Sequence, residues 1–110
     1  MPYLRNGTLV LGPYAGTETP HIRIQLNQSL CGAAASLRKT VVVNDVAKDP
    51  RYLMGSEHTK SEIIVTLVVR NQVVGELDIN SYFKDTWDRK EQEFVEKCAA
   101  LAANSLRARI

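Results

Sequence analysis

The residues best suited to chemistry lie in the segment "SEIIVTLVVRNQVVGELDINS", residues 61–81, which reads as two strands around a turn. The second strand carries Glu76, Asp78 and Asn80 at alternate positions. Side chains alternate between the two faces of a strand, so these three share one face. Two carboxylates and an amide, with no lysine or arginine on either strand, suit a ligand that carries an ammonium, a guanidinium or a basic heterocycle.

The pairing register of this hairpin decides which other residues join that face, because a slip of one residue moves every side chain to the opposite face. A two-residue loop over 71–72 would pair Asp78 with Val65 and put acids on the apolar face. A three-residue loop over 70–72 pairs Asp78 with Ile64 instead, and we expect this second register. The polar face then gathers Glu62, Thr66, Glu76, Asp78 and Asn80.

In that register Glu62 lies diagonally from Asp78, about 7–8 Å away, near enough to hold one small cation between them. Two readings of the face stay open on the pattern alone. It lines a binding pocket, or it is the solvated outer face that antiparallel sheets commonly have.

Composition bounds the classes of function. A chain of 110 residues builds one domain, 1–110, around one core. A net charge of +2 without a basic run gives no reason to expect nucleic acid or membrane partners. The longest apolar run, 63–69, is far shorter than the ~20 residues of a membrane span, and residues 1–8 do not resemble a secretory signal. Cys31 and Cys98 suit neither a disulfide framework nor a zinc clip, so we expect a cytoplasmic protein.

The remaining elements follow from periodicity and turn residues. We expect a hairpin around Asn6-Gly7, an alternating strand over 21–26, a short helix over 29–39 with Ser29 as N-cap, and a buried strand over 40–43. A polar loop spans 44–60, and a helix runs from Trp87 to about Ala108, started by Thr86 or Asp85. This order predicts an α+β domain with a central antiparallel sheet.

The last helix has two adjacent apolar rows, which together are wider than one packing face needs. The rows are Trp87, Phe94, Cys98 and Leu101, and Val95, Ala99, Ala102 and Leu106. Either this helix only covers the sheet, or it also pairs two copies as a homodimer through residues 87–108.

Five short sequence motifs follow one another along the chain: "LVLGPYAG", "SLCGAAAS", "VVVNDV", "KSEIIVTLVV" and "VVGELDINS". Together they resemble a GAF domain, and within that superfamily most closely the free methionine-(R)-sulfoxide reductase branch, from about Tyr3 to Ala103. The resemblance implies a central antiparallel sheet with a C-terminal helix on one face and a ligand pocket on the other. It also favours pairing through terminal helices.

In the reductase branch, a Glu in the S-E-I motif and two acids in the G-x-L-D-x-D motif bind the amino group of a free amino acid. Glu62 and Asp78 match the first two of these, and Asn80 stands where the family has its second Asp. Tyr3 falls near an aromatic residue of the family's pocket. With Cys31 added, these are the ligand-binding residues that the resemblance implies.

The family uses three cysteines for its chemistry, since one thiol attacks the sulfoxide and another resolves the sulfenic acid. Cys31 matches one of them, whereas His21 and Gly55 stand at the other two positions, Gly55 at that of the attacking thiol. We therefore expect a small-molecule-binding regulatory or sensor module without catalysis, acting on an amino acid or amine. The alternatives are a reductase-like thiol enzyme in which Cys31 is redox-active, and a dimerisation element with a vestigial pocket.

Two further expectations concern what the chain does not carry. We expect no metal or cofactor, because His21 and His58 lack the spacing of a metal site. The family has a helix and most of a strand before the position of Tyr3. We therefore expect either a fragment of a longer protein or an oligomer in which another copy covers the sheet.

Overall fold

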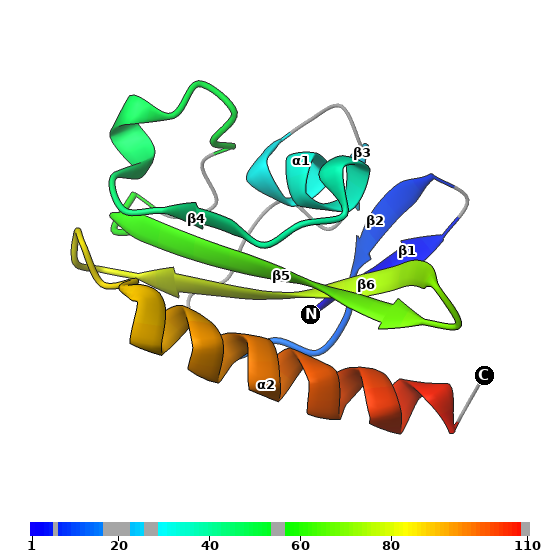
Figure 1. Cartoon of the computed structure of the whole chain (residues 1–110). Coiled ribbons are helices and arrows are strands. Elements are labelled where there is room, and N and C mark those ends of the chain that lie inside the picture. The colour runs from blue at the N-terminus through cyan, green and yellow to red at the C-terminus, as the bar shows by residue number, and fades with distance from the viewer. Residues whose placement is uncertain (6, 17–22, 26–28, 54–56, 109–110) are drawn as a thin grey trace.

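The computed structural model describes residues 1–5, 7–16, 23–25, 29–53 and 57–108. Six antiparallel strands form one sheet in the order β3-β2-β1-β6-β5-β4, with α1 on one face and α2 on the other (Figure 1). The strands are β1 Pro2–Arg5, β2 Thr8–Leu11, β3 Arg23–Gln25, β4 Val41–Val43, β5 Ser61–Val69 and β6 Gln72–Ser81. The helices are α1 Ser29–Leu37, the 3₁₀ turn η1 Val46–Lys48 and α2 Arg89–Arg107. The α+β prediction is confirmed.

Two apolar clusters fill the spaces between the sheet and its helices. On the α1 side, buried side chains come from β2, α1, β4, η1 and β5: Leu9, Leu30, Cys31, Ala34, Val41, Val43, Val46 and Ile64. On the α2 side they are Ile63, Val65, Leu67, Val69, Trp87, Val95, Ala99 and Ala103. Strand β5 is thus buried on both faces, which explains why its sequence is an almost continuous apolar run.

The hairpin of β5 and β6 has the expected register. Glu62 pairs with Asn80, Ile64 with Asp78, and Thr66 with Glu76. The predicted three-residue loop is wrong, however. The turn is the pair Arg70-Asn71, with φ of 51° and 64°, and a β-bulge beside Leu67 shifts the pairing by one residue. A tight turn that needs two left-handed residues is therefore combined with a bulge to keep the acids on one face.

Helix α1 begins as expected, since the Ser29 hydroxyl accepts a hydrogen bond from the Gly32 N–H at 3.3 Å. Helix α2 begins later than predicted. Its N-cap is Asp88, whose carboxylate accepts from the Glu91 N–H at 2.8 Å. Thr86 and Asp85 belong to the preceding turn, where the Thr86 hydroxyl donates to the Phe83 carbonyl.

The amino-terminal hairpin is confirmed, with Arg5 paired to Thr8. Strand β1 joins β6 where Tyr3 pairs with Gly75. The two backbones are so close there that a Cβ on Gly75 would lie 2.7 Å from the Pro2 carbonyl oxygen. A glycine inside a strand often marks such an approach.

The expected strand over 21–26 is described only as β3, and its other residues lie outside the described part of the chain. Among the described residues, no helix is both long and apolar enough to cross a membrane.

Candidate functional site

A cavity of about 740 Å³ opens beside the C-terminal half of β6, a size typical of small-molecule sites. Its walls come from the first turn of α1, the strands β1 and β2, the loop after η1, and the turn that follows β6. They are largely apolar and aromatic, and include Leu9, Leu11, Tyr14, Tyr52, Tyr82, Phe83 and Trp87. Such a site can enclose a small ligand, and a few polar groups can fix its orientation.

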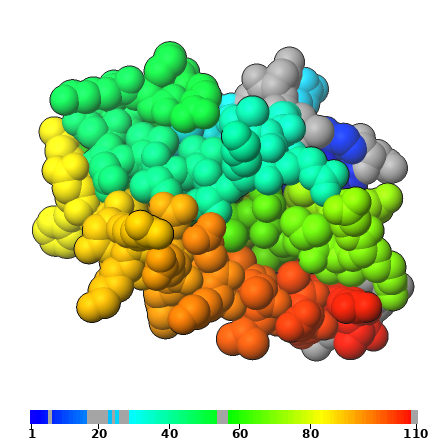
Figure 2. Space-filling view, in the orientation of Figure 1, coloured from blue at the N-terminus to red at the C-terminus, as the bar shows by residue number. Residues whose placement is uncertain are grey.

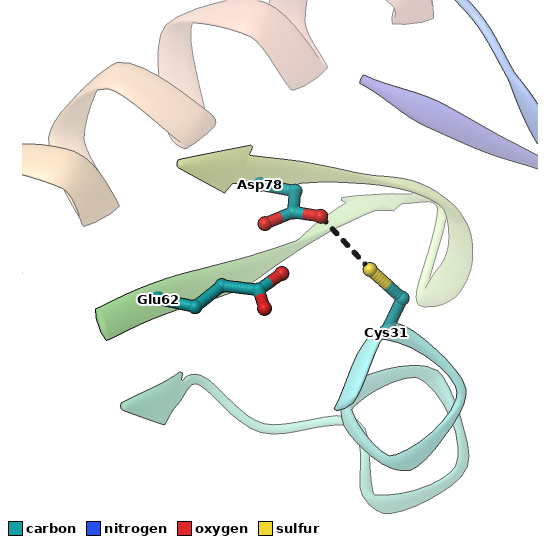
Figure 3. A group of neighbouring side chains, drawn as sticks. All are labelled: Cys31, Glu62 and Asp78. Atoms are coloured by element: carbon teal, nitrogen blue, oxygen red, sulfur yellow. Dashed lines mark hydrogen bonds between the residues drawn. The ribbon is translucent and has the colours of Figure 1, made fainter. Parts of the chain in front are cut away.

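The polar groups of the cavity converge from three elements. Cys31 comes from α1, Glu62 from β5 and Asp78 from β6, and their side chains point toward one another (Figure 3). One ligand atom from each lies within 4.8 Å of the others. The Cys31 thiol donates a hydrogen bond to the Asp78 Oδ2 at 3.0 Å, whereas the Asp78 Oδ1 is buried without a partner among the described residues.

A third carboxyl group lies beside this cluster. Glu76 precedes Asp78 on the same face of β6, and its side chain is 0% exposed. Neither carboxylate oxygen of Glu76 has a hydrogen-bond partner among the described residues. Buried polar groups without partners are rare and costly, so this carboxyl group needs either a proton or a cation nearby.

The burial of these groups raises their pKa values. Burial, helped by the neighbouring Asp78 carboxyl, raises the pKa of Glu62 well above its ordinary value. Burial and then Asp78 raise the pKa of Glu76 to about 8, although the nearby Cys31 thiol partly opposes this. Burial, Asp78, Glu62 and Glu76 together raise the pKa of Cys31. The clustered carboxyl groups therefore favour either protonation or the binding of a cation.

The cavity brings together four of the expected binding residues: Cys31, Glu62, Asp78 and Asn80 all line it. Cys31, Glu62 and Asp78 form its acidic floor, while Asn80 is exposed. The geometry therefore allows these side chains to contact one ligand.

The structure places Tyr3, one of the expected binding residues, outside the cavity. Tyr3 does not line the cavity, and its ring packs beside Gly12 and Gly75 instead. The cause is strand alternation, because Tyr3 pairs with Gly75, which faces away from the side that carries Glu76 and Asp78.

Other residues considered for chemistry lie elsewhere. His58 is exposed and its ring is 5.7 Å from that of Tyr82, whereas His21 and Gly55 are outside the described residues. Cys98 is on α2, across the sheet from Cys31. Sequence reasoning placed Glu76 on the acidic face but not in the site, and it did not foresee the aromatic wall of Tyr52, Tyr82, Phe83 and Trp87.

The fold and the matched sequence define the class of protein. The GAF domain family model matches residues 3–106, and the chain belongs to the GAF family. Among solved structures it is similar to the type II free methionine-R-sulfoxide reductase of Thermoplasma acidophilum, with a TM-score of 0.90 and 31% identity, covering 94% of this chain and 73% of that one.

Two curated relatives are also free methionine-R-sulfoxide reductases. The Saccharomyces cerevisiae protein is 36% identical over 99 residues, which cover 89% of this chain and 54% of that protein. The Escherichia coli protein is 34% identical over 99 residues, which cover 89% of this chain and 59% of that protein. The chain therefore spans between about half and three fifths of the length of these relatives.

Proposed function

We propose that this GAF domain binds a free amino acid or a related amine, and that it acts as a sensor module and not as a catalyst. The observation that carries the proposal is the gathering of Glu62, Glu76 and Asp78 at one buried place. None of them forms an ion pair with a described lysine or arginine. A ligand ammonium would pair with these groups in their ionised form, in place of the protons that their raised pKa values favour.

The rest of the cavity favours a ligand with an apolar side chain. The aromatic and aliphatic wall offers contact area beyond the acidic floor. Asn80 replaces one acid of the resembled family's motif and removes one negative charge, which favours a zwitterion or a monocation over a dication. The named activity of the relatives makes methionine sulfoxide the first ligand to test.

A second candidate function is reduction of free methionine-R-sulfoxide, and the similarity to named reductases favours it. The Cys31 thiolate would attack the sulfoxide sulfur; with uptake of one proton, the oxygen would pass to Cys31, which releases methionine and leaves a sulfenic acid. One external thiol would then form a mixed disulfide and release water, and a second would regenerate Cys31.

Two features weigh against this second candidate. Cys31 is the thiol that lines the cavity, and Cys98 lies across the sheet, so no second described thiol can resolve the sulfenic acid. Burial, and then the neighbouring carboxyl groups, also keep Cys31 protonated by raising its pKa. A bound ammonium would offset that effect, so turnover would depend on the ammonium of the substrate.

Binding can be measured through Trp87, the single tryptophan, which lines the cavity. Methionine sulfoxide and methionine are titrated against N-acetylmethionine sulfoxide, which has no ammonium. We expect a saturable fluorescence change and a rise in Tm for the free amino acids alone, since about 2.7 kcal/mol of stabilisation accompanies ligand at 100 times its Kd. Asp78→Asn should abolish the response, while Glu57→Gln, an equal charge change on an exposed side chain, should keep it. An equal response to the acetylated compound would refute the proposal.

Activity separates the two candidates. The protein is incubated with free methionine-R-sulfoxide and a dithiol, and methionine is quantified. Binding without turnover supports the sensor. If the wild type turns over the substrate, and if turnover is lost in Cys31→Ser but kept in Cys98→Ser, the protein is a reductase instead.

We also propose that the domain pairs with a second copy through α2. Phe94 and Leu101 lie seven residues apart on this helix and are 63% and 71% exposed. Residues at this spacing share one side of a helix. Helix α2 forms a continuous ridge along the lower side of the molecule in Figure 2. We place the domain in the cytoplasm, where its two free thiols would stay reduced.

A further inference from the structure

The three groups on the floor of the cavity have the arrangement of metal ligands. Cys31 Sγ and one carboxylate oxygen each from Glu62 and Asp78 lie within 4.8 Å of one another. A zinc ion holds sulfur at about 2.3 Å and carboxylate oxygen at about 2.0–2.2 Å, so its ligand atoms are separated by roughly 3–4.5 Å. The Cys31 Sγ and Asp78 Oδ2 are 3.0 Å apart and no two of the three ligand atoms are more than 4.8 Å apart, so small side-chain movements would bring all three onto one ion.

A second, independent observation comes from Glu76. Its side chain is completely buried two residues before Asp78 on the same face of β6, and neither of its carboxylate oxygens has a hydrogen bond to a described residue. The buried Asp78 Oδ1 is also unpaired. An apolar core would not place three unpaired carboxylate oxygens together, and a cation among them would supply the missing interaction.

We propose that Cys31, Glu62 and Asp78 bind a divalent transition-metal ion such as zinc. Glu76 lies beside these ligands, and in its protonated form it can donate a hydrogen bond to a ligand carboxylate and orient it. A thiolate ligand favours zinc, iron or cobalt over magnesium or calcium, which prefer oxygen ligands alone. The open cavity leaves a further coordination position accessible to water or to a small ligand.

This metal site uses the carboxylates of the proposed amine site but does not depend on that proposal. An ion and an ammonium would compete for Glu62 and Asp78, and each can be tested without the other. The three ligands come from positions 31, 62 and 78, which do not form a known sequence motif, and among the described residues no histidine belongs to the group.

The test is a cobalt titration of the chelator-treated full chain in a buffer free of amines and amino acids. Cobalt bound to a thiolate gives a charge-transfer band in the near ultraviolet, whereas cobalt bound to oxygen alone does not. We expect this band to saturate at one cobalt ion per chain, and zinc to remove it. Magnesium in excess should leave it unchanged.

Variants then assign the ligands. Cys31→Ser should abolish the band and Cys98→Ser should retain it. Glu76→Leu, which removes the hydrogen-bond donor, should weaken cobalt binding about 10–100-fold, whereas Glu76→Gln, which keeps an N–H donor, should bind cobalt as the wild type does. A band that survives in Cys31→Ser, one that is lost in Cys98→Ser, or no saturable band at all would overturn the proposal.

A second measurement avoids dependence on variants that fail to fold. X-ray absorption of the zinc-loaded wild-type chain should show one sulfur at about 2.3 Å together with oxygen neighbours. A shell without sulfur would overturn the proposal. The amine titrations are performed on the wild-type chain in the presence of a chelator, so failure of one proposal is distinguishable from failure of the other.

Discussion

Replacement of Glu76 by glutamine tests the electrostatic account of the cavity most directly. Glu76 is completely buried, without a hydrogen-bond partner among the described residues. The titratable groups that face it are Asp78 on β6, Glu62 on β5 and Cys31 on α1. The glutamine side chain has nearly the same shape but cannot ionise, so the substitution should change how stability depends on pH.

The sign follows from the direction of the shift. Burial and Asp78 raise the pKa of Glu76 from 4.5 to about 8 in the folded state. Between these two values the folded state binds more protons than the unfolded state, so the free energy of unfolding falls as pH rises. This contribution is most favourable below pH 4.5 and is fully lost above about pH 8.

The magnitude follows from the same two values. Each pH unit within that window is worth at most about 1.4 kcal/mol. Relative to acidic solution, Glu76 should therefore lower the free energy of unfolding by roughly 1 kcal/mol at pH 5, roughly 3 at pH 7 and roughly 4 at pH 8. This is a large part of a total stability on the order of 5–15 kcal/mol.

The assay is urea unfolding of the wild type and Glu76→Gln at pH 5, 6, 7 and 8 at constant ionic strength. The buried amide of glutamine costs about 1–3 kcal/mol at every pH. The diagnostic quantity is therefore how the difference in free energy of unfolding between the variant and the wild type changes with pH. Between pH 5 and pH 8, we expect the free energy of unfolding of Glu76→Gln to rise by about 3 kcal/mol relative to that of the wild type. Glu57→Gln, which removes a charge from an exposed side chain, should follow the wild type. A difference that stays constant over this range would refute the reasoning.

Three more predictions concern the scaffold and its assembly. Asp88→Ala removes the N-cap of α2 and should lower the free energy of unfolding by about 1 kcal/mol, measured by urea unfolding. Gly75→Ala places a methyl group 2.7 Å from the Pro2 carbonyl oxygen. The resulting strain of about 1–3 kcal/mol should weaken the contact between β1 and β6. Faster hydrogen exchange of the β1 amides would show this weakening. If α2 pairs two copies as proposed, the wild type should sediment as a dimer and the double variant Phe94→Asp and Leu101→Asp as a folded monomer, and an equal mass for the two proteins would exclude pairing through this surface.

Much of the fold could be predicted because local patterns and tertiary packing agree. The alternation of Glu76, Asp78 and Asn80 with Leu77 and Ile79 required one register, and that register is observed. The turn was wrong in detail. Register depends on the faces of the strands, whereas a bulge can shift the loop by one residue at small cost, and alternation alone does not reveal it.

The site was less accessible to prediction. Glu62 and Asp78 could be named because they share a face in the correct register, but the contact of Cys31 with Asp78 depends on how α1 packs over the sheet. Tyr3 was misplaced because its position along β1 was considered without its face. Glu76 carried a usable signal, since the alternation that selected Asp78 selects its neighbour two residues earlier.

The same imbalance of charge underlies the amine proposal and the metal proposal. Glu62, Glu76 and Asp78 are held together by β5 and β6, whose packing on both faces fixes their separation. Because the strands cannot move apart, the carboxyl groups reduce their repulsion by keeping protons, as the raised pKa values of Glu62 and Glu76 show. A cation that replaces these protons would pair with the ionised carboxylates, and that gain favours binding. Cys31 distinguishes the two kinds of cation, because a thiolate is a strong ligand for zinc and a poor one for an ammonium.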